Sequence, residues 1–292
     1  MTITTNAELV SAVENWIGDT TIAARVAEFI SLGEATIHRR VRNRAMEAQI
    51  DLRLQAAQDG GTAGGTANAL TCSLDGTTTL ATGLTVSLTI AATNTSAATL
   101  NADGTGVVDI RKGDGTEAME AGDLSIGFDY TFYYDGTYWR LVPKGGVPLP
   151  SRYLAMRRVF LHADPKRRLD MFQPMDFHEK YLSTQTSTPE AFTIEGDFIV
   201  FGPAPQATQT VRMLYYRRPQ AIASAVSRLF TENPDLYLYN ALVHASPYLN
   251  DDSRAVTWAT FAQTAYDDIE KADRKDRYSG APGVSRSGVV GG

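Results

Sequence analysis

The chain has 292 residues, of which 43% are hydrophobic and 21% charged, with a net charge of −6 and a single cysteine, Cys72. These values are typical of globular chains, the length is compatible with two domains, and no apolar run is long enough to span a membrane. One cysteine excludes an intramolecular disulfide, which fits assembly in a reducing cytoplasm. The N-terminus lacks a basic region followed by an apolar one, so we expect no secretory signal, and the acidic balance does not indicate nucleic-acid binding.

The first elements are predicted to be two helices. Asn6 is placed to cap a helix that runs to about Ile17 and ends at Gly18, and Asp19 or Thr20 is placed to cap a longer one. The longer helix has an apolar face with the spacing of a 3.6-residue period. That face consists of Ile22, Val26, Phe29, Ile30, Gly33, Ile37 and Val41.

Four arginines gather toward the end of the longer helix: Arg39, Arg40, Arg42 and Arg44. Cations in the last turns of a helix complement its dipole. The alternative is an interface role, because arginine forms bidentate pairs with the carboxylates of a partner or faces nucleic acid in a channel. The sequence leaves both interpretations open.

Residues 60–146 differ from their surroundings, with abundant Thr, Gly, Ala and Asp and little Lys or Arg. The glycine-rich opening, Asp59 to Gly65, reads as a flexible linker and lacks the Gly-Lys-Ser/Thr of a phosphate loop. Apolar residues alternate over 84–90, and a hairpin is predicted to turn at Asp135-Gly136. These features indicate a small inserted β-sandwich or barrel. Its aromatic stripe, either core or a stacking surface for a ligand, includes Tyr134, Tyr138 and Trp139.

Beyond the insert, the sequence predicts a helix over 174–182, a hairpin turning at Gly196-Asp197 and a strand over 211–217. Asn233 with Pro234 is a favoured start for a further helix. The last helix has the face Trp258, Phe261, Ala262, Ala265, Tyr266 and Ile269, and residues 279–292 have the composition of a flexible tail.

The sequence offers no catalytic constellation. The four histidines are not at metal-ligand spacing, and a Gly-x-Ser-x-Gly elbow is absent. The adjacent Asp251 and Asp252 fit a turn that caps the last helix better than a metal or acid–base pair. Cys72 lies in an alternating apolar run, which favours a small buried hydrophobe over a nucleophile. We therefore expect no enzyme activity, no cofactor and no metal.

Both segments outside the insert resemble the head–tail adaptor proteins of short-tailed bacteriophages. The likeness begins in the N-terminal helices, in Glu8-Leu9-Val10, Trp16-Ile17, Ala27-Glu28-Phe29-Ile30-Ser31-Leu32-Gly33-Glu34 and Arg42-Asn43-Arg44-Ala45-Met46-Glu47. It continues in Tyr153 to Val159, Val211 to Pro219, Asn233 to Leu242, Ala245 to Asp252 and Trp258. The insert departs from the family pattern and resembles, more weakly, the small β modules of phage tail and fibre proteins.

The resemblance implies a structural virion protein at the head–tail junction, assembled in the host cytoplasm. It implies a ring, commonly of twelve copies, beneath the portal protein, which lengthens the channel for genomic DNA without sequence recognition. Further implied partners are the tail nozzle and the tail fibre, with no membrane. The alternatives are a carbohydrate- or receptor-binding role for the insert, and a virion-associated peptidoglycan hydrolase, for which the sequence shows no acid pair.

The expected fold class is α+β. A mainly helical adaptor domain with a small β-hairpin or sheet element, residues 1–59 and 147–278, is interrupted by an inserted all-β sandwich or barrel at 60–146 and followed by a flexible tail at 279–292. The candidate portal-binding residues are Arg274, Lys275, Arg277, Tyr278 and Arg286. Candidate channel or inter-subunit residues are Arg39, Arg40, Arg42 and Arg44, and candidate fibre or glycan contacts are Tyr134, Tyr138 and Trp139.

Overall fold

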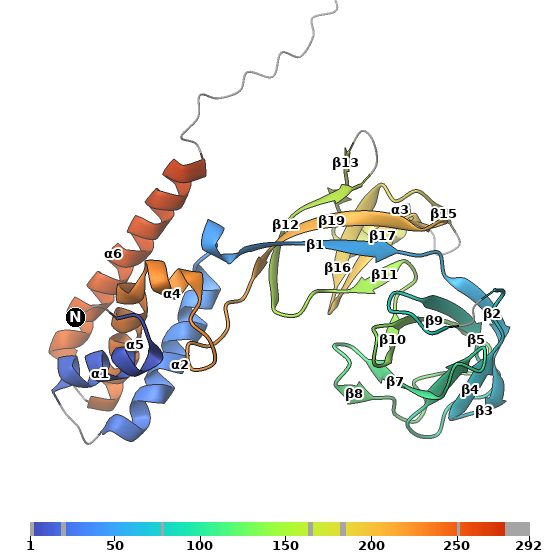
Figure 1. Cartoon of the computed structure of the whole chain (residues 1–292), viewed down its shortest axis with the longest axis horizontal. Helices are drawn as coiled ribbons and strands as arrows, with labels where there is room; N and C mark the ends of the chain where they lie inside the picture. The colour runs from blue at the N-terminus through green and yellow to red at the C-terminus, as the bar shows by residue number, and fades with distance from the viewer. Residues whose placement is uncertain are drawn as a thin grey trace, which may run out of the picture. The chain divides into compact units, whose positions relative to one another are not determined.

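The computed structural model describes residues 3–18, 22–76, 79–162, 166–181, 185–249 and 252–277 (Figure 1). The chain divides into two compact units. The helical unit consists of residues 1–48, 152–155 and 216–292, and the strand unit consists of residues 49–151 and 156–215. Both units are therefore discontinuous in sequence, and the ends of three long strands are counted with the helical unit.

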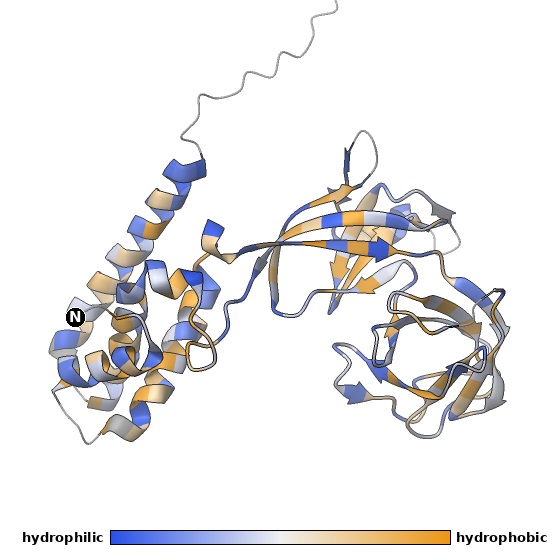
Figure 2. Ribbon diagram, in the orientation of Figure 1, coloured by the Kyte–Doolittle hydropathy of each residue, from blue (hydrophilic) through white to orange (hydrophobic). Residues whose placement is uncertain are grey.

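The helical unit is built from α1 (Asn6–Ile17), α2 (Ala23–Arg40), the short η2 (Arg44–Met46), α4 (Arg228–Glu232), α5 (Pro234–Leu249) and α6 (Asp252–Arg277). Its core joins side chains from all of these elements, including Leu9, Val26, Met46, Phe230, Leu242 and Trp258. Figure 2 shows that the helices carry apolar and polar stretches side by side, as amphipathic helices around one core do.

The first helix begins one residue earlier than predicted, because Thr5 and not Asn6 is the N-cap. The Thr5 hydroxyl accepts from Glu8 N at 3.2 Å, and the Glu8 carboxylate accepts in return from Thr5 N at 3.0 Å. This reciprocal pair is a capping box. Gly18 ends the helix in the left-handed region, at φ 75°, as the sequence predicted.

The predicted apolar face of α2 is confirmed. Its members Val26 and Ile37 are fully buried, and Gly33 lies where α2 meets α5. A Cβ atom at Gly33 would lie 3.1 Å from Ala241 N and 3.3 Å from the Asn240 Cβ atom. The glycine therefore allows the two helices to approach closely. The expected caps Asp19 and Thr20 lie outside the described residues.

The start of α5 at Pro234 is confirmed, and α6 packs on α5 through most of its predicted face. Phe261 also contacts α5, through the Tyr239 ring at 5.4 Å, but its side chain stays 41% exposed. At the centre of this packing the Tyr266 hydroxyl donates to Asn240 Oδ1 at 2.9 Å, and both residues are buried. A polar link is thus closed inside an otherwise apolar contact.

The largest sheet of the strand unit has nine strands, with the order β2-β5-β9-β10-β7-β6-β4-β3 and β8 paired to β7. Its strands are β2 (Gln58–Thr62), β3 (Gly64–Thr66), β4 (Ala69–Cys72), β5 (Thr85–Thr89), β6 (Thr99–Ala102), β7 (Val108–Lys112), β8 (Glu117–Ala118), β9 (Asp129–Tyr134) and β10 (Trp139–Val142). The predicted hairpin is confirmed, with Trp139 opposite Tyr134 in antiparallel pairing.

The two ends of this strand order are nearly joined by the chain itself. Only Ala63 separates β2 from β3, so the sheet curls into a nearly closed barrel around a core that includes Leu100, Phe132 and Trp139. The prediction of a flexible linker at Asp59 to Gly65 is wrong, because these residues form strands. Their glycines permit close approach, since a Cβ atom at Gly60 would lie 2.5 Å from the Leu88 side chain.

The remaining strands form a four-stranded sheet of order β1-β19-β12-β13, another of order β11-β17-β16-β14, and the pair β15-β18. They are β1 (Glu47–Leu54), β11 (Gly146–Pro148), β12 (Tyr153–Leu161), β13 (Arg167–Arg168), β14 (Asp170–Met171), β15 (Thr186–Ser187), β16 (Ala191–Glu195), β17 (Phe198–Gly202), β18 (Ala204–Pro205) and β19 (Gln209–Arg217). Helix α3 (Pro174–Lys180) packs on β16 through Phe177, which is buried with Ala191 and Val200.

The predicted fold class is wrong in its central point, because the part outside the insert is not mainly helical. That part alone contributes the long strands β1, β12 and β19 and the hairpin β16–β17. Residues 47–54 lie in the range 1–59 that was expected to be mainly helical, yet Ile50, Leu52 and Leu54 alternate with polar residues. A period of two is a strand pattern. The switch from the helical period of α2 to this strand period was overlooked because the two patterns follow each other closely. The inserted domain at 60–146 stays a prediction.

Candidate functional site

The candidate portal-binding residues at the end of α6 differ in how many contacts they make within the protein. Arg277 donates from Nε to Asp273 at 2.5 Å, and from Nη2 to Glu47 at 2.6 Å and to the Tyr216 hydroxyl at 3.2 Å. These acceptors hold the pKa of Arg277 above its usual value, the Asp273 hydrogen bond contributing most. Asp273 also accepts from the backbone N–H of Arg44 at 2.8 Å. Arg277 therefore fixes the end of α6 inside the helical unit.

Two other cations of this group point outward. Arg274 pairs with Glu270 at 2.6 Å on an exposed face, and Lys275 is exposed. Surface ion pairs of this kind contribute little stability, so Arg274 can leave Glu270 and pair with an acidic group of another protein at a small free-energy cost. Tyr278 and Arg286 lie outside the described residues. Portal binding by all five residues stays a prediction.

The four arginines after the apolar face of α2 do not form one surface. Arg42 donates to the main-chain oxygens of His38 and Val41 at 2.7 and 2.6 Å, which satisfies carbonyls at the helix end. Arg40 lies over the Tyr266 ring at 4.0 Å and donates to Gln263, and Arg44 pairs with Asp276 at 3.7 Å. Arg39 is exposed, donates a hydrogen bond to Thr36 of its own helix, and acts electrostatically on His244 and Tyr266. The channel or inter-subunit role stays a prediction.

The aromatic candidates of the insert are mostly drawn into the barrel. Trp139 is fully buried, and its ring lies 5.4 Å from that of Tyr134. Tyr138 is half-buried beneath the Arg111 guanidinium, which lies 4.8 Å from its ring centroid. Trp139 thus presents no face to a fibre or a glycan in this structure, and a stacking role at this place is left to Tyr134 and Tyr138, for which it stays a prediction.

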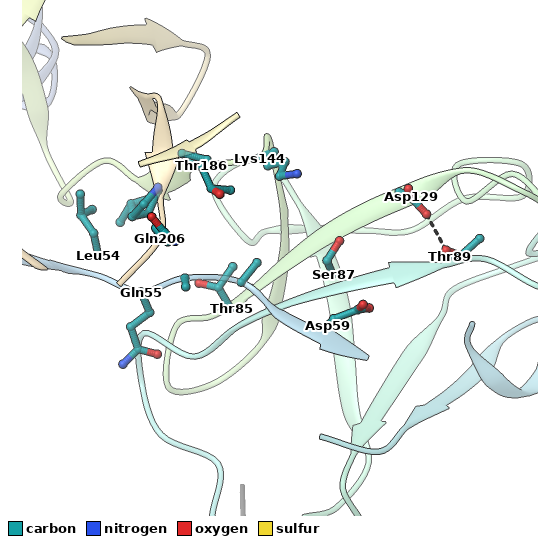
Figure 3. A pocket seen from close by; sticks show the side chains of 17 residues that line it. Leu54, Gln55, Asp59, Thr85, Ser87, Thr89, Asp129, Lys144, Thr186 and Gln206 are labelled. Atoms are coloured by element: carbon teal, nitrogen blue, oxygen red, sulfur yellow. Dashed lines mark hydrogen bonds between the residues drawn. The ribbon is translucent and has the colours of Figure 1, made fainter. Parts of the chain in front are cut away.

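A polar cavity of about 470 Å³ lies in the strand unit (Figure 3). Its described lining comes from the end of β1, the outer side of β5, the start of β9 and the segments around 144–147 and 204–206. Thr89 donates to Asp129 at 2.5 Å on one wall, as the dashed line in Figure 3 marks. The labelled polar side chains include Asp59, Thr85, Ser87, Lys144 and Gln206. Hydroxyls, carboxylates and one ammonium suit a polar ligand, but the described lining holds neither a histidine nor a cysteine for nucleophilic catalysis.

The other side chains that could take part in catalysis or metal binding are unreactive or isolated. Burial raises the pKa of the half-buried Cys72 thiol to about 11, with Asp103 adding to the effect, so the thiolate is scarce at neutral pH. His178 pairs with Glu195 at 2.6 Å on the surface. Among the described residues, no three His, Cys, Asp or Glu side chains are grouped to hold a metal ion. None of the described helices has both the length and the apolar character to cross a bilayer.

The sequence pointed to Arg277 but missed its partners. The four-residue spacing of Asp273 and Arg277 was an available signal for one ion pair on the helix. Glu47 and Tyr216 come from strands that lie far away in sequence, and nothing in a single sequence indicates that they converge on α6.

Comparison with known proteins identifies the family. Residues 136–286, just over half of the chain, match the family model described as SU10 adaptor protein. No curated protein matches the sequence. The matched range contains α3 to α6 and the strands β10 to β19, which means that it includes parts of both units. The chain therefore belongs to the SU10 adaptor protein family and is a structural adaptor protein of a phage virion.

Proposed function

We propose that the protein is a head–tail adaptor that forms a ring, commonly of twelve copies, beneath the portal protein of a short-tailed phage. The observation that carries the proposal is the family match over residues 136–286. In this role the ring extends the DNA channel, through which the genome passes without sequence recognition during ejection. The tail nozzle and the fibres attach to the other side of the ring.

The surface of the helical unit supports assembly with other protein chains. Trp16 of α1 and Phe261 of α6 are 44% and 41% exposed, and both contact the ring of Tyr239 on α5, at 5.9 and 5.4 Å. Val256, one to two turns before Phe261 on α6, is 71% exposed. Exposed apolar groups of this size mark interaction surfaces, and each protomer of a ring buries two different surfaces against its neighbours.

The insert supports the platform role for nozzle and fibres. Ile126 and Phe128, on the loop before β9, are 61% and 64% exposed. Two large apolar side chains at one loop favour a protein contact over a purely solvated decoration. The buried position of Trp139 gives no support to a glycan-binding site built on that side chain.

The experiment is assembly with the purified portal protein, followed by native mass spectrometry and electron cryo-microscopy. The expected product is one stoichiometric ring on each portal. Phe261→Glu places a charge in the exposed aromatic group of the helical unit and is expected to prevent ring formation, whereas the matched Ile126→Glu on the insert is expected to leave it intact. A stable dimer that ignores the portal contradicts the proposal.

A further inference from the structure

A cavity of about 580 Å³ lies in the helical unit beside the last turns of α2. Glu34, His38 and Arg39 line it from α2, Arg42 from just after that helix, and Arg218 from the segment after β19. The wall is completed by Ser31, Ala35, Leu154, Pro219 and Ala221. Basic groups from two separate parts of the chain, residues 38–42 and Arg218, thus meet around a partly apolar recess.

The positive charge of this cavity is poorly balanced. Among the residues that the structure describes, Arg39 and Arg218 have no acidic partner, and the guanidinium of Arg42 donates to neutral carbonyls. The one carboxylate of the lining, Glu34, is 7% exposed and accepts from Ile222 N at 2.7 Å. Burial raises the pKa of Glu34, while its hydrogen bond from Ile222 N acts in the opposite direction.

The pKa of His38 is affected by the positive charges of the same arginines. Burial lowers its pKa to about 4, and the charges of Arg218 and Arg42 add to the effect, so the imidazole is neutral at pH 7. Its Nε2 atom is buried and has no hydrogen-bond partner among the described residues. The cavity therefore combines guanidinium groups that have no acidic partner among the described residues with an imidazole that carries no charge of its own.

We propose that this cavity receives the carboxylate of an acidic peptide segment from a protein partner. Guanidinium groups give carboxylates short, charge-assisted and often bidentate hydrogen bonds. The apolar wall suits the methylene groups of such a side chain. A DNA duplex presents its phosphates on a continuous ridge, whereas a recess of this volume accommodates a projecting side chain. The proposal goes beyond ring formation, because it holds whether the segment belongs to a second copy of this chain or to another virion protein.

The test is fluorescence anisotropy of a labelled hexaglutamate peptide titrated with the full chain. Arg218→Gln and Arg39→Gln are each expected to weaken binding about ten- to hundredfold, the usual effect of losing one charge-assisted hydrogen bond. Arg25→Gln is the matched control and is expected to bind like the wild type. It removes one exposed arginine from the same helix, but that arginine pairs with Glu28 at 3.3 Å, away from the cavity. Circular dichroism checks that each variant is folded.

A second readout follows the His38 resonance by NMR across pH, with His38→Gln as the assignment control. A bound carboxylate offsets the field of Arg218 and Arg42, so the pKa of His38 is expected to rise when the peptide is present. The other titratable or charged groups that line the cavity are Glu34 and Arg39.

Three results separate the outcomes. No peptide binding, or equal binding by Arg218→Gln and Arg25→Gln, overturns the proposal. A short DNA duplex that loses affinity in Arg218→Gln, while the peptide does not, overturns it in favour of a phosphate site. If the peptide binds as expected, sedimentation of the chain alone identifies the source. If the wild type self-associates and Arg218→Gln does not, the acidic segment belongs to a second copy of this chain. If the wild type does not self-associate, the acidic segment belongs to another protein.

Discussion

The hydrogen bond from Tyr266 to Asn240 gives a quantitative test of how α5 and α6 are held together. Tyr266→Phe removes only the hydroxyl and keeps the ring, including its contact with the Arg40 guanidinium at 4.0 Å. Asn240 Oδ1 then lies in the core without a donor, because Asn240 is 3% exposed. An acceptor left unsatisfied in the core costs about 1–3 kcal/mol, and since Tyr266 is itself 8% exposed, we expect about 2 kcal/mol.

The measurement is urea unfolding followed by ellipticity at 222 nm, which reports mainly the four longest helices, all in the helical unit. Tyr239→Phe is the matched control, since its hydroxyl has no hydrogen-bond partner among the described residues, and we expect a change within about 0.5 kcal/mol. Asn240→Leu combined with Tyr266→Phe removes both polar groups, so the two losses are expected not to add. Equal losses for the two tyrosine variants, or full additivity in the double variant, would refute the reasoning.

Four further predictions follow from other contacts. Gly33→Leu forces a side chain against the α5 backbone, 3.1 Å from its Cβ position, and is expected to lower the free energy of unfolding by about 1–3 kcal/mol, measured by the same urea titration. Arg277→Gln leaves Glu47 and Asp273 without their cation and is expected to cost about 1–3 kcal/mol, with thermal unfolding as the readout; an unchanged melting temperature contradicts it. Replacing residues 60–145 by a short Gly/Ser linker from Asp59 to Gly146 is expected to preserve portal assembly and to reduce fibre attachment in pull-downs, whereas loss of portal binding by a folded protein would place the insert in the ring interface. Truncation after Tyr278 is expected to leave the helix content unchanged and to weaken portal docking at matched salt; equal docking would show that the tail is dispensable.

The sequence was most informative where a short-range pattern decides the structure. The buried face of α2, the start of α5 at Pro234 and the turn at Asp135-Gly136 all follow from spacing, capping and turn chemistry within one element. These features depend on residues that are neighbours in the chain, so a single sequence contains the needed information.

Prediction failed where long-range pairing decides the structure. Residues Asp59 to Gly65 have the composition of a linker, yet they form strands because β4 and β5 supply hydrogen-bonding partners. The basic cavity beside α2 depends on Arg218, which is about 180 positions away in sequence from His38. No spacing rule connects two such residues, so only the folded structure brings them to notice.

The single residue between β2 and β3 affects how readily neighbouring copies of the barrel can pair through their sheet edges. Sheets with free edges pair with one another when many copies are held at high local concentration, as they would be in the proposed ring. Because Ala63 alone connects β2 to β3, the two strands at the ends of the barrel order lie next to each other in the chain, so their unpaired edges are not spread along an open sheet. In the proposed ring, identical modules are then expected to stand close together without pairing edge to edge, with Ile126 and Phe128 among the side chains exposed for contacts with other proteins.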